Sequence, residues 1–186
     1  MPNWCNNTVR LTHEDPAMII RARDALTNGK FFNEFVPVPK QLAETAASSQ
    51  TDEEVTKANI EQYGYASWYD FCVNEWGTKW DTDCHSVDTY EEHPDTLDAV
   101  FDTAWSPPIQ FYEKLERMGF QVEAKYYESG MCFAGMYENG CDSYYELSGM
   151  SAEEVERTIP EELDAEFGIS DTMYEWEVDN TEESEE

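Results

Sequence analysis

Hydrophobic and polar residues alternate along several short segments, and a period of two is typical of strands buried on one face. The clearest case is Phe120–Tyr127, where Phe120, Val122 and Ala124 share one side and polar residues share the other. The sequence predicts strands over Trp4–Thr12, Cys84–Tyr90, Leu97–Trp105, Phe120–Tyr127 and Met131–Tyr137. The third is ambiguous, because Leu97–Ala104 is also compatible with the start of a helix.

Other segments carry the start and stop signals of helices. Asp15-Pro16 supplies an N-cap and a proline at the first helical position, and Asn28-Gly29 supplies a left-handed stop. Ser106-Pro107-Pro108 opens a second helix, which Gly119 ends. Ser151–Glu154 fits a capping box. The predicted helices therefore cover Pro16–Thr27, residues 106–118 and acidic segments after Ser151 that are interrupted at Pro160 and end near Gly168.

The order of these elements predicts an α+β fold, a ferredoxin-like antiparallel sheet with helices on one face. The fold is expected to occupy residues 1–137, with a polar, helix-prone insertion near 40–63. An acidic extension that is partly helical is predicted over 138–176. Residues 177–186 are almost all acidic or polar, which predicts a disordered tail.

The net charge is the feature of the composition that most restricts the possible partners of this chain. The 186 residues include 41 acidic and 11 basic residues, for a net charge of −30. The excess is concentrated after residue 138, where 17 acidic residues accompany one base, Arg157. Direct binding to nucleic acid or to an anionic membrane is disfavoured, because both depend on cations that neutralise phosphates. Salt is expected to stabilise the fold, since it screens this self-repulsion.

The five cysteines are widely spaced, and their number is odd. No secretory signal peptide precedes them, so reduced thiols in a cytoplasm are expected. The chain has no apolar run near the ~18 residues that a membrane helix needs. We therefore expect a soluble cytoplasmic protein.

Three tryptophan-containing patches resemble a known family. They are Met1–Asn7, Trp76–Asp81 and Phe101–Pro108, and together they are similar to the YubB-like ferredoxin-like domains of phages, plasmids and prophages. The resemblance covers roughly residues 1–137. It implies a ferredoxin-like topology and an origin in a mobile element. The family has no agreed activity, so the resemblance implies no catalytic residues.

Candidate metal ligands gather in one patch: Asp81, Asp83, Cys84, His85, Asp88 and His93. Zinc sites usually need a second pair of ligands, and Ser86 stands where a calcium loop needs glycine. Polar decoration of a hairpin is therefore the preferred interpretation, with no metal and no cofactor. The alternative is a small-molecule or metal-dependent enzyme that uses this patch and the tryptophan-rich region, with a cysteine nucleophile and His85 or His93 as base.

The tryptophans have two interpretations as well. Trp4, Trp76, Trp80 and Trp105 are suited to an aromatic ligand pocket or to the core between helices and sheet. The core is the expected outcome, because large aromatic side chains are usually buried. Lys79 is expected to pair with a nearby acid.

The acidic surface remains as the leading candidate for function. Without any binding role, the acidic residues would serve solubility, form a solvated tail or reflect adaptation to high salt. The functional hypothesis is a non-enzymatic accessory protein of a phage or other mobile element that binds a basic host protein. Its narrower form is a DNA mimic that inhibits a DNA-binding defence or regulatory protein. The predicted partner-binding residues are Glu153, Glu154, Glu156, Glu161, Glu162, Asp164 and Glu166.

Overall fold

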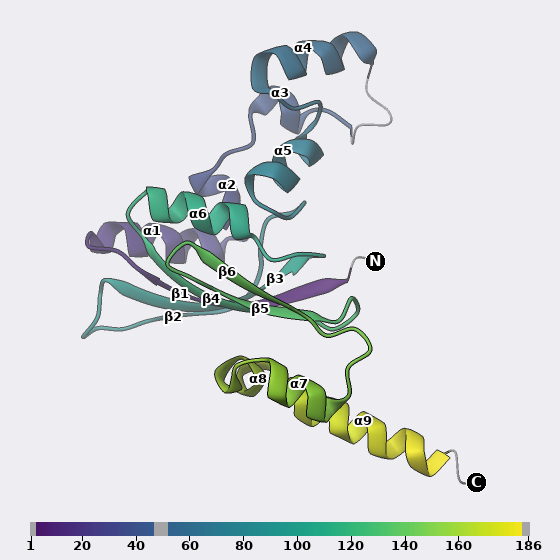
Figure 1. Ribbon diagram of the computed structural model, residues 1–186. Helices are drawn as coiled ribbons and strands as arrows, with labels where there is room; N and C mark the ends of the chain where they lie inside the picture. The colour runs from purple at the N-terminus through teal and green to yellow at the C-terminus, as the bar shows by residue number, and fades with distance from the viewer. Residues whose placement is uncertain (1–2, 47–51, 184–186) are drawn as a thin grey trace.

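The computed structural model describes residues 3–46 and 52–183, and it has an α+β architecture built on one antiparallel sheet (Figure 1). Six strands lie in the order β2-β3-β1-β4-β5-β6. Their bounds are β1 Trp4–Thr12, β2 Asp83–Thr89, β3 Thr96–Ala104, β4 Gln121–Glu128, β5 Phe133–Glu138 and β6 Cys141–Glu146. The five predicted strands are confirmed to within a few residues, and the ambiguous Leu97–Ala104 segment belongs to a strand.

One face of the sheet carries α1 (Pro16–Thr27), α2 (Phe31–Phe35) and α6 (Ile109–Arg117) and is called the α6 face (Figure 1). The Asp15 side chain accepts a hydrogen bond from Ala17 N, so the predicted cap of α1 is confirmed. Val9 and Leu11 of β1 point into this layer and are almost fully buried. The largest apolar core lies here, between these helices and the sheet.

Residues 40–63, the predicted insertion, hold α3 (Lys40–Ala43) and α4 (Glu53–Tyr63), with residues 47–51 outside the described part of the chain. The next helix, α5 (Trp68–Glu75), leads back to the sheet, and Figure 1 shows α3 and α4 farther from the strands than α6. Lys114 of α6 holds α5 through an ion pair of 2.9 Å with Glu75.

The opposite face, called the α8 face, carries the C-terminal helices α7 (Ala152–Thr158), α8 (Glu161–Phe167) and α9 (Ile169–Glu183) (Figure 1). Helices on one face were expected for residues 1–137, and α1, α2 and α6 do share one face. The helices of the predicted C-terminal extension cover the opposite face. A second apolar cluster causes this arrangement: Val155, Ile159 and Leu163 pack on Ala134 of β5. The capping box at Ser151 and Glu154 is confirmed.

The C-terminal region also corrects two boundaries. Strand β6 pairs with β5 throughout its length, so the sheet extends past the predicted domain end at residue 137. Residues 177–183, predicted to be disordered, belong to α9, and residues 184–186 lie outside the described residues. Within the described part of the chain, no helix is both long and apolar enough to cross a membrane.

Gly135 of β5 marks a tight contact on the α6 face. A Cβ atom there would lie 2.2 Å from the hydroxyl of Tyr126 and 2.7 Å from the carbonyl oxygen of Ser143. The Tyr126 side chain crosses this position and donates a hydrogen bond of 2.7 Å to Asp142 of β6. Glycine therefore lets a tyrosine on β4 reach over β5 to the edge strand.

Candidate functional site

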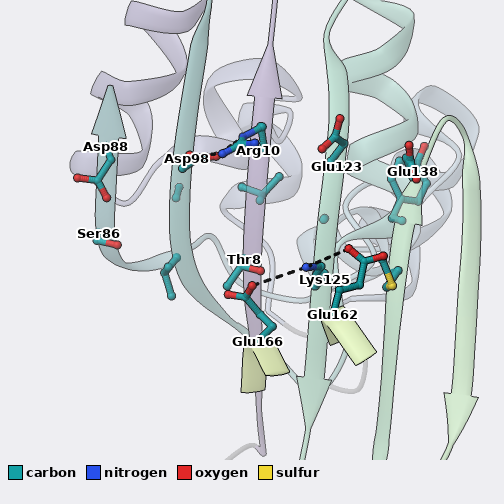
Figure 2. Close-up of a pocket in the computed structure, with 16 residues that line it drawn as sticks. Thr8, Arg10, Ser86, Asp88, Asp98, Glu123, Lys125, Glu138, Glu162 and Glu166 are labelled. Carbon is teal, nitrogen blue, oxygen red and sulfur yellow. Dashed lines mark hydrogen bonds and ion pairs between the residues drawn. The ribbon is translucent and has the colours of Figure 1, made fainter. Parts of the chain in front are cut away.

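The α8 face is polar over most of the strands that α7–α9 leave uncovered. Alternation along β1 places Asn6, Thr8 and Arg10 on this face, while their neighbours are buried on the other. Where α8 approaches β4 and β5, the same face becomes apolar. A hollow of about 560 Å³ lies over the polar part, and Figure 2 shows the side chains that border it.

One line of charged residues crosses five strands of the hollow at the same register. Asp88 of β2 lies opposite Asp98 of β3, and Asp98 lies opposite Arg10 of β1. Arg10 lies opposite Glu123 of β4, which in turn lies opposite Glu138 of β5. We call these five residues the charged row. It places like charges directly opposite each other twice, which disfavours the sheet locally.

Arg10, the one cation of the row, forms an ion pair with Asp98 on the neighbouring strand. Arg10 donates two hydrogen bonds, of 2.8 and 2.9 Å, to Asp98. Tyr90 donates a third to the same carboxylate, at 2.6 Å. The hydrogen bond from Arg10 is the main reason that the pKa of Asp98 lies below its usual range. Among the described residues, Asp88, Glu123 and Glu138 form no ion pair.

A second cation, Lys125 of β4, lies between the sheet and α8. Its ammonium is 3.6 Å from a carboxylate oxygen of Glu162 and 3.8 Å from one of Glu166 (Figure 2). The hollow is thus bordered by six carboxylates and two cations, and both cations already face carboxylates within it. The arrangement leaves negative charge that only a ligand or solvent ions can balance.

The predicted acidic site is divided by the structure. Glu162 and Glu166 border the hollow. The others are directed elsewhere, because α7 and α8 are separate helices that meet at Pro160. Glu153 pairs with Arg157, Glu154 caps α7, Glu156 accepts from Tyr174, Asp164 accepts from Ser170, and Glu161 is exposed in the first turn of α8. Two of the seven predicted residues therefore border the hollow, and the other five lie elsewhere on α7 and α8.

The candidate metal patch is dispersed as well. Asp81 is turned inward, where it accepts hydrogen bonds of 2.9 Å from Phe32 N and Asn33 N at the start of α2. Cys84 packs toward the main core, and His85 contacts Asp102 at 2.9 Å. Asp83 and Asp88 lie on the α8 face, while His93 is in the β2–β3 turn. No set of three such side chains in the described residues is placed to hold a metal ion.

The three tryptophan patches, in contrast, converge at one end of the sheet. Trp105 N donates to the carbonyl of Asn3 at 3.0 Å, which joins the first patch to the third. Ser106 donates to the carbonyl of Gly77 at 2.6 Å, and Thr78 donates to that of Ala104 at 3.0 Å. The Ser106 side chain therefore links the third patch to the second and does not cap a helix, contrary to the prediction from the sequence. Helix α6 begins at Ile109 and has no side-chain cap. Gly77 turns here with φ +91, a conformation that favours glycine.

Only one of the four tryptophans in these patches is a core residue. Trp76 is buried and donates its indole N–H to the carbonyl of Val36 at 2.9 Å. Trp4, Trp80 and Trp105 are 39%, 41% and 40% exposed, so the expectation of burial is wrong for them. We call these three the indole cluster. The Lys79 ammonium lies over the rings of Trp80 and Trp105 rather than beside an acid.

Sequence reasoning missed both the charged row and the exposure of the indole cluster. The row depends on the register of five strands, which no single segment encodes. One available signal was the strand Phe133–Tyr137, which is apolar at nearly every position and therefore typical of burial on both faces. That pattern indicates a covering layer on the second face, and with it the partly covered hollow.

Comparison with known proteins gives little further information. No family model matches the chain, and no curated protein matches it. The resemblance to YubB-like domains therefore stays a prediction. Among solved structures, the chain is similar to a crystal structure of protein api92 from Yersinia pseudotuberculosis, with family model DUF1281. The two share 10% identity at a TM-score of 0.43, over 81% of this chain and 100% of that one.

Proposed function

We propose that this protein is a non-enzymatic acidic binding protein whose α8 face receives a basic protein. The observation that carries the proposal is the hollow over the charged row, with six carboxylates against two cations. The cations are already matched within the hollow, so an incoming Lys or Arg meets carboxylates without displacing a strong internal pair at Asp88, Glu123 or Glu138.

The energetics of the row favour a cationic ligand. Asp88 opposite Asp98, and Glu123 opposite Glu138, are like-charge pairs that cost the fold stability. A cation placed between the two members of such a pair removes this repulsion and gains two attractions. The net charge of −30 also steers basic partners toward the protein and speeds association at low salt.

Charge density decides what kind of partner the row alone can bind. Five strands at their usual spacing span roughly 19 Å, so a net charge of −3 gives about one charge per 6 Å. Duplex DNA has one charge per ~1.7 Å of axis. The row alone therefore suits a basic segment of a protein. Imitation of duplex DNA requires the acids of α7, α8 and α9 in addition.

DNA mimicry is the finer form of the proposal. In this form, a DNA-binding host protein contacts the hollow and the acidic helices together, and the chain acts as an accessory protein of a phage or other mobile element. We also propose a ferredoxin-like topology for its first part. The order β2-β3-β1-β4, with α1 after β1 and α6 after β3, supports that assignment.

The test uses a fluorescent decapeptide of alternating lysine and glycine, measured by anisotropy at low and high salt. The triple variant Asp88→Asn, Glu123→Gln, Glu138→Gln is expected to weaken binding at least tenfold at low salt. The control variant Glu14→Gln, Glu61→Gln, Glu175→Gln removes the same charge from exposed positions elsewhere. Equal loss in both variants would reduce the proposal to a general effect of net charge.

DNA mimicry has its own test. Host lysate is passed over immobilised protein, and captured proteins are challenged with duplex DNA. A DNA-binding protein that duplex DNA releases, and that the variant Glu153→Gln, Glu156→Gln, Glu161→Gln no longer captures, would support mimicry. A partner that keeps its affinity for this variant and ignores DNA would restrict the function to the hollow.

A further inference from the structure

The indole cluster has the geometry of a cation site that the protein fills with its own side chain. The Lys79 ammonium lies 3.7 Å from the ring centre of Trp80 and 3.9 Å from that of Trp105. Trp4 extends the aromatic surface, with its ring centre 6.2 Å from that of Trp80. An ammonium held between two indoles is the arrangement by which proteins recognise cationic ligands.

Lys79 is held in this slot by the rings alone. Its ammonium forms no hydrogen bond and no ion pair with any described residue. A cation over a partly exposed ring is bound weakly in water. The side chain can therefore leave the slot at small cost when a better-suited cation arrives.

Exposure of the three indoles is not required by the fold. The neighbouring Trp76 already fills the core and ties α5 to the segment after α2. Three tryptophans exposed side by side are unusual on a solvent face, and such patches mark interaction sites. Tryptophan and arginine are also the side chains that most often dominate binding at protein interfaces.

The charges beside the cluster select a cationic occupant. Trp4 lies on the α8 face, opposite Ala104. Asp102, two residues before Ala104 on β3, lies on the same face and directly opposite Asp83 of β2. The two form a third like-charge pair on this face. Within the described part of the chain, the Asp102 carboxylate has a hydrogen bond of 2.6 Å from Asn6 and a contact of 2.9 Å with His85.

Through Trp4, the indole cluster reaches the face of the sheet that carries the charged row. Trp4 and Arg10 are six residues apart on the same side of β1, which is about 20 Å at the usual rise of a strand. An extended basic segment of six or seven residues can span both. The protein surface therefore offers an aromatic anchor at one end and carboxylates at the other.

We infer that the slot between Trp80 and Trp105 is the anchoring site for an arginine side chain of the basic partner, with Lys79 as its stand-in in the free protein. This inference rests on the proposed function, because it names the side chain by which the same partner is held. Guanidinium is planar and less strongly hydrated than ammonium, so it stacks on indoles better than lysine does. Arrival of the arginine releases Lys79 toward solvent.

The test follows the indole N–H signals by NMR while the blocked tripeptide acetyl-Gly-Arg-Gly-amide is added. The signals of Trp80 and Trp105 are expected to shift, and that of the exposed Trp176 on α9 to stay. Lys79→Ala empties the slot, so it should bind this peptide about fivefold more tightly than the wild type, the value of one exposed cation–π contact. The same peptide with citrulline in place of arginine should shift nothing.

Trp80→Leu and Trp105→Leu keep apolar volume but remove the rings, and each should lose the arginine response, whereas Trp176→Leu should keep it. If either ring variant fails to fold, as judged by its melting curve, the Lys79→Ala result still decides. Unchanged or weaker binding by Lys79→Ala would overturn the inference.

Failure here is distinguishable from failure of the proposed function. Loss of lysine-glycine peptide binding in the charged-row variant, with no arginine response at the indoles, would leave the acidic hollow as the site and remove the anchor. An arginine response with no effect of the charged-row variant would keep the anchor and reject the hollow as the main site.

Discussion

The two faces of the sheet are built from alternate residues of the same strands, yet they have opposite properties. On β3, Phe101 is fully buried under the helices of the α6 face, while its neighbour Val100 is 37% exposed on the α8 face. The α6 face is filled by aromatic rings in contact, such as Phe31 and Phe111 at 4.9 Å. The α8 face carries the charged row, in which like charges oppose each other.

The two faces therefore contribute differently to stability. Apolar burial on the α6 face contributes most of the stability, since burial of large side chains is the main favourable term in folding. The two like-charge pairs of the charged row subtract stability. The proposal that this face receives a basic partner accounts for like charges kept side by side, and four experiments would break or sharpen the contrast between the two faces.

The largest difference is expected between two adjacent residues of β3. Phe101→Ala should lower the free energy of unfolding by about 3–5 kcal/mol, because it leaves a cavity under α2 and α6. Val100→Ala should change it by less than about 1 kcal/mol, since its side chain is partly exposed. Urea denaturation measures both. Similar losses at the two positions would show that the α8 face is packed as tightly as the other.

The next effect concerns the tight contact at Gly135. Gly135→Ala should cost on the order of 1–3 kcal/mol, because its Cβ meets Tyr126 and the backbone of β6. The matched control is Gly130→Ala, whose closest contact is the side-chain amide of Asn3, which can rotate away. Thermal melts of the two variants give the comparison, and an unaffected Gly135→Ala protein would mean that Tyr126 has another place to go.

Removal of charge from the row should act in the opposite direction. Asp88→Asn combined with Glu138→Gln relieves both like-charge pairs and should raise the free energy of unfolding by about 0.2–1 kcal/mol at low salt. The gain should shrink in high salt, where charges are screened. Denaturation at two salt concentrations tests this. A loss of stability would show that these carboxylates support the fold.

The smallest expected effect is on the pH dependence of the free energy of unfolding, to which Asp98 and Asp142 contribute in opposite directions. The pKa of Asp98 is lowered by its hydrogen bond with Arg10, so its contribution is present above the unfolded pKa of about 3.9 and is lost as pH falls through the lower folded value. Partial desolvation of the carboxylate, against which Tyr126 lies, raises the pKa of Asp142, so stability declines as pH rises from about 3.9 through its raised value.

Asn substitutions separate these two slopes in chemical denaturation between pH 3 and pH 7. Asp98→Asn should flatten the loss on the acid side, and Asp142→Asn should flatten the decline above pH 4. Profiles parallel to the wild type in both variants would mean that other carboxylates set the pH dependence.

Local signals were enough to predict most of the sheet and the helices α1, α6 and α7. Strict alternation gave Gln121–Tyr127, and side-chain caps gave the starts of α1 and α7. Strand β6 was not predicted, because nearly all of its residues are exposed and its sequence shows no alternation of apolar and polar residues. Helix α9 was not predicted because, among residues 169–179 whose burial is described, only Ile169 and Ser170 at its start are buried.

The candidate site was harder to predict, because it depends on register and on which strands are neighbours. Asp88, Asp98 and Glu138 are separated by long stretches of sequence and meet only through strand pairing. The tryptophan patches could be found as motifs, but composition could not say that Trp76 turns inward while Trp80 turns outward.

The carboxylate of Asp81 has a consequence for the order of folding events. Helix α2 has five residues and no cap of its own, and an isolated helix of this length does not persist in water. Its first amides, Phe32 N and Asn33 N, are held by an acceptor 49 and 48 positions later in the chain. The helix therefore forms only once the segment before β2 has docked, and hydrogen exchange should report both as one cooperative unit that opens and closes together.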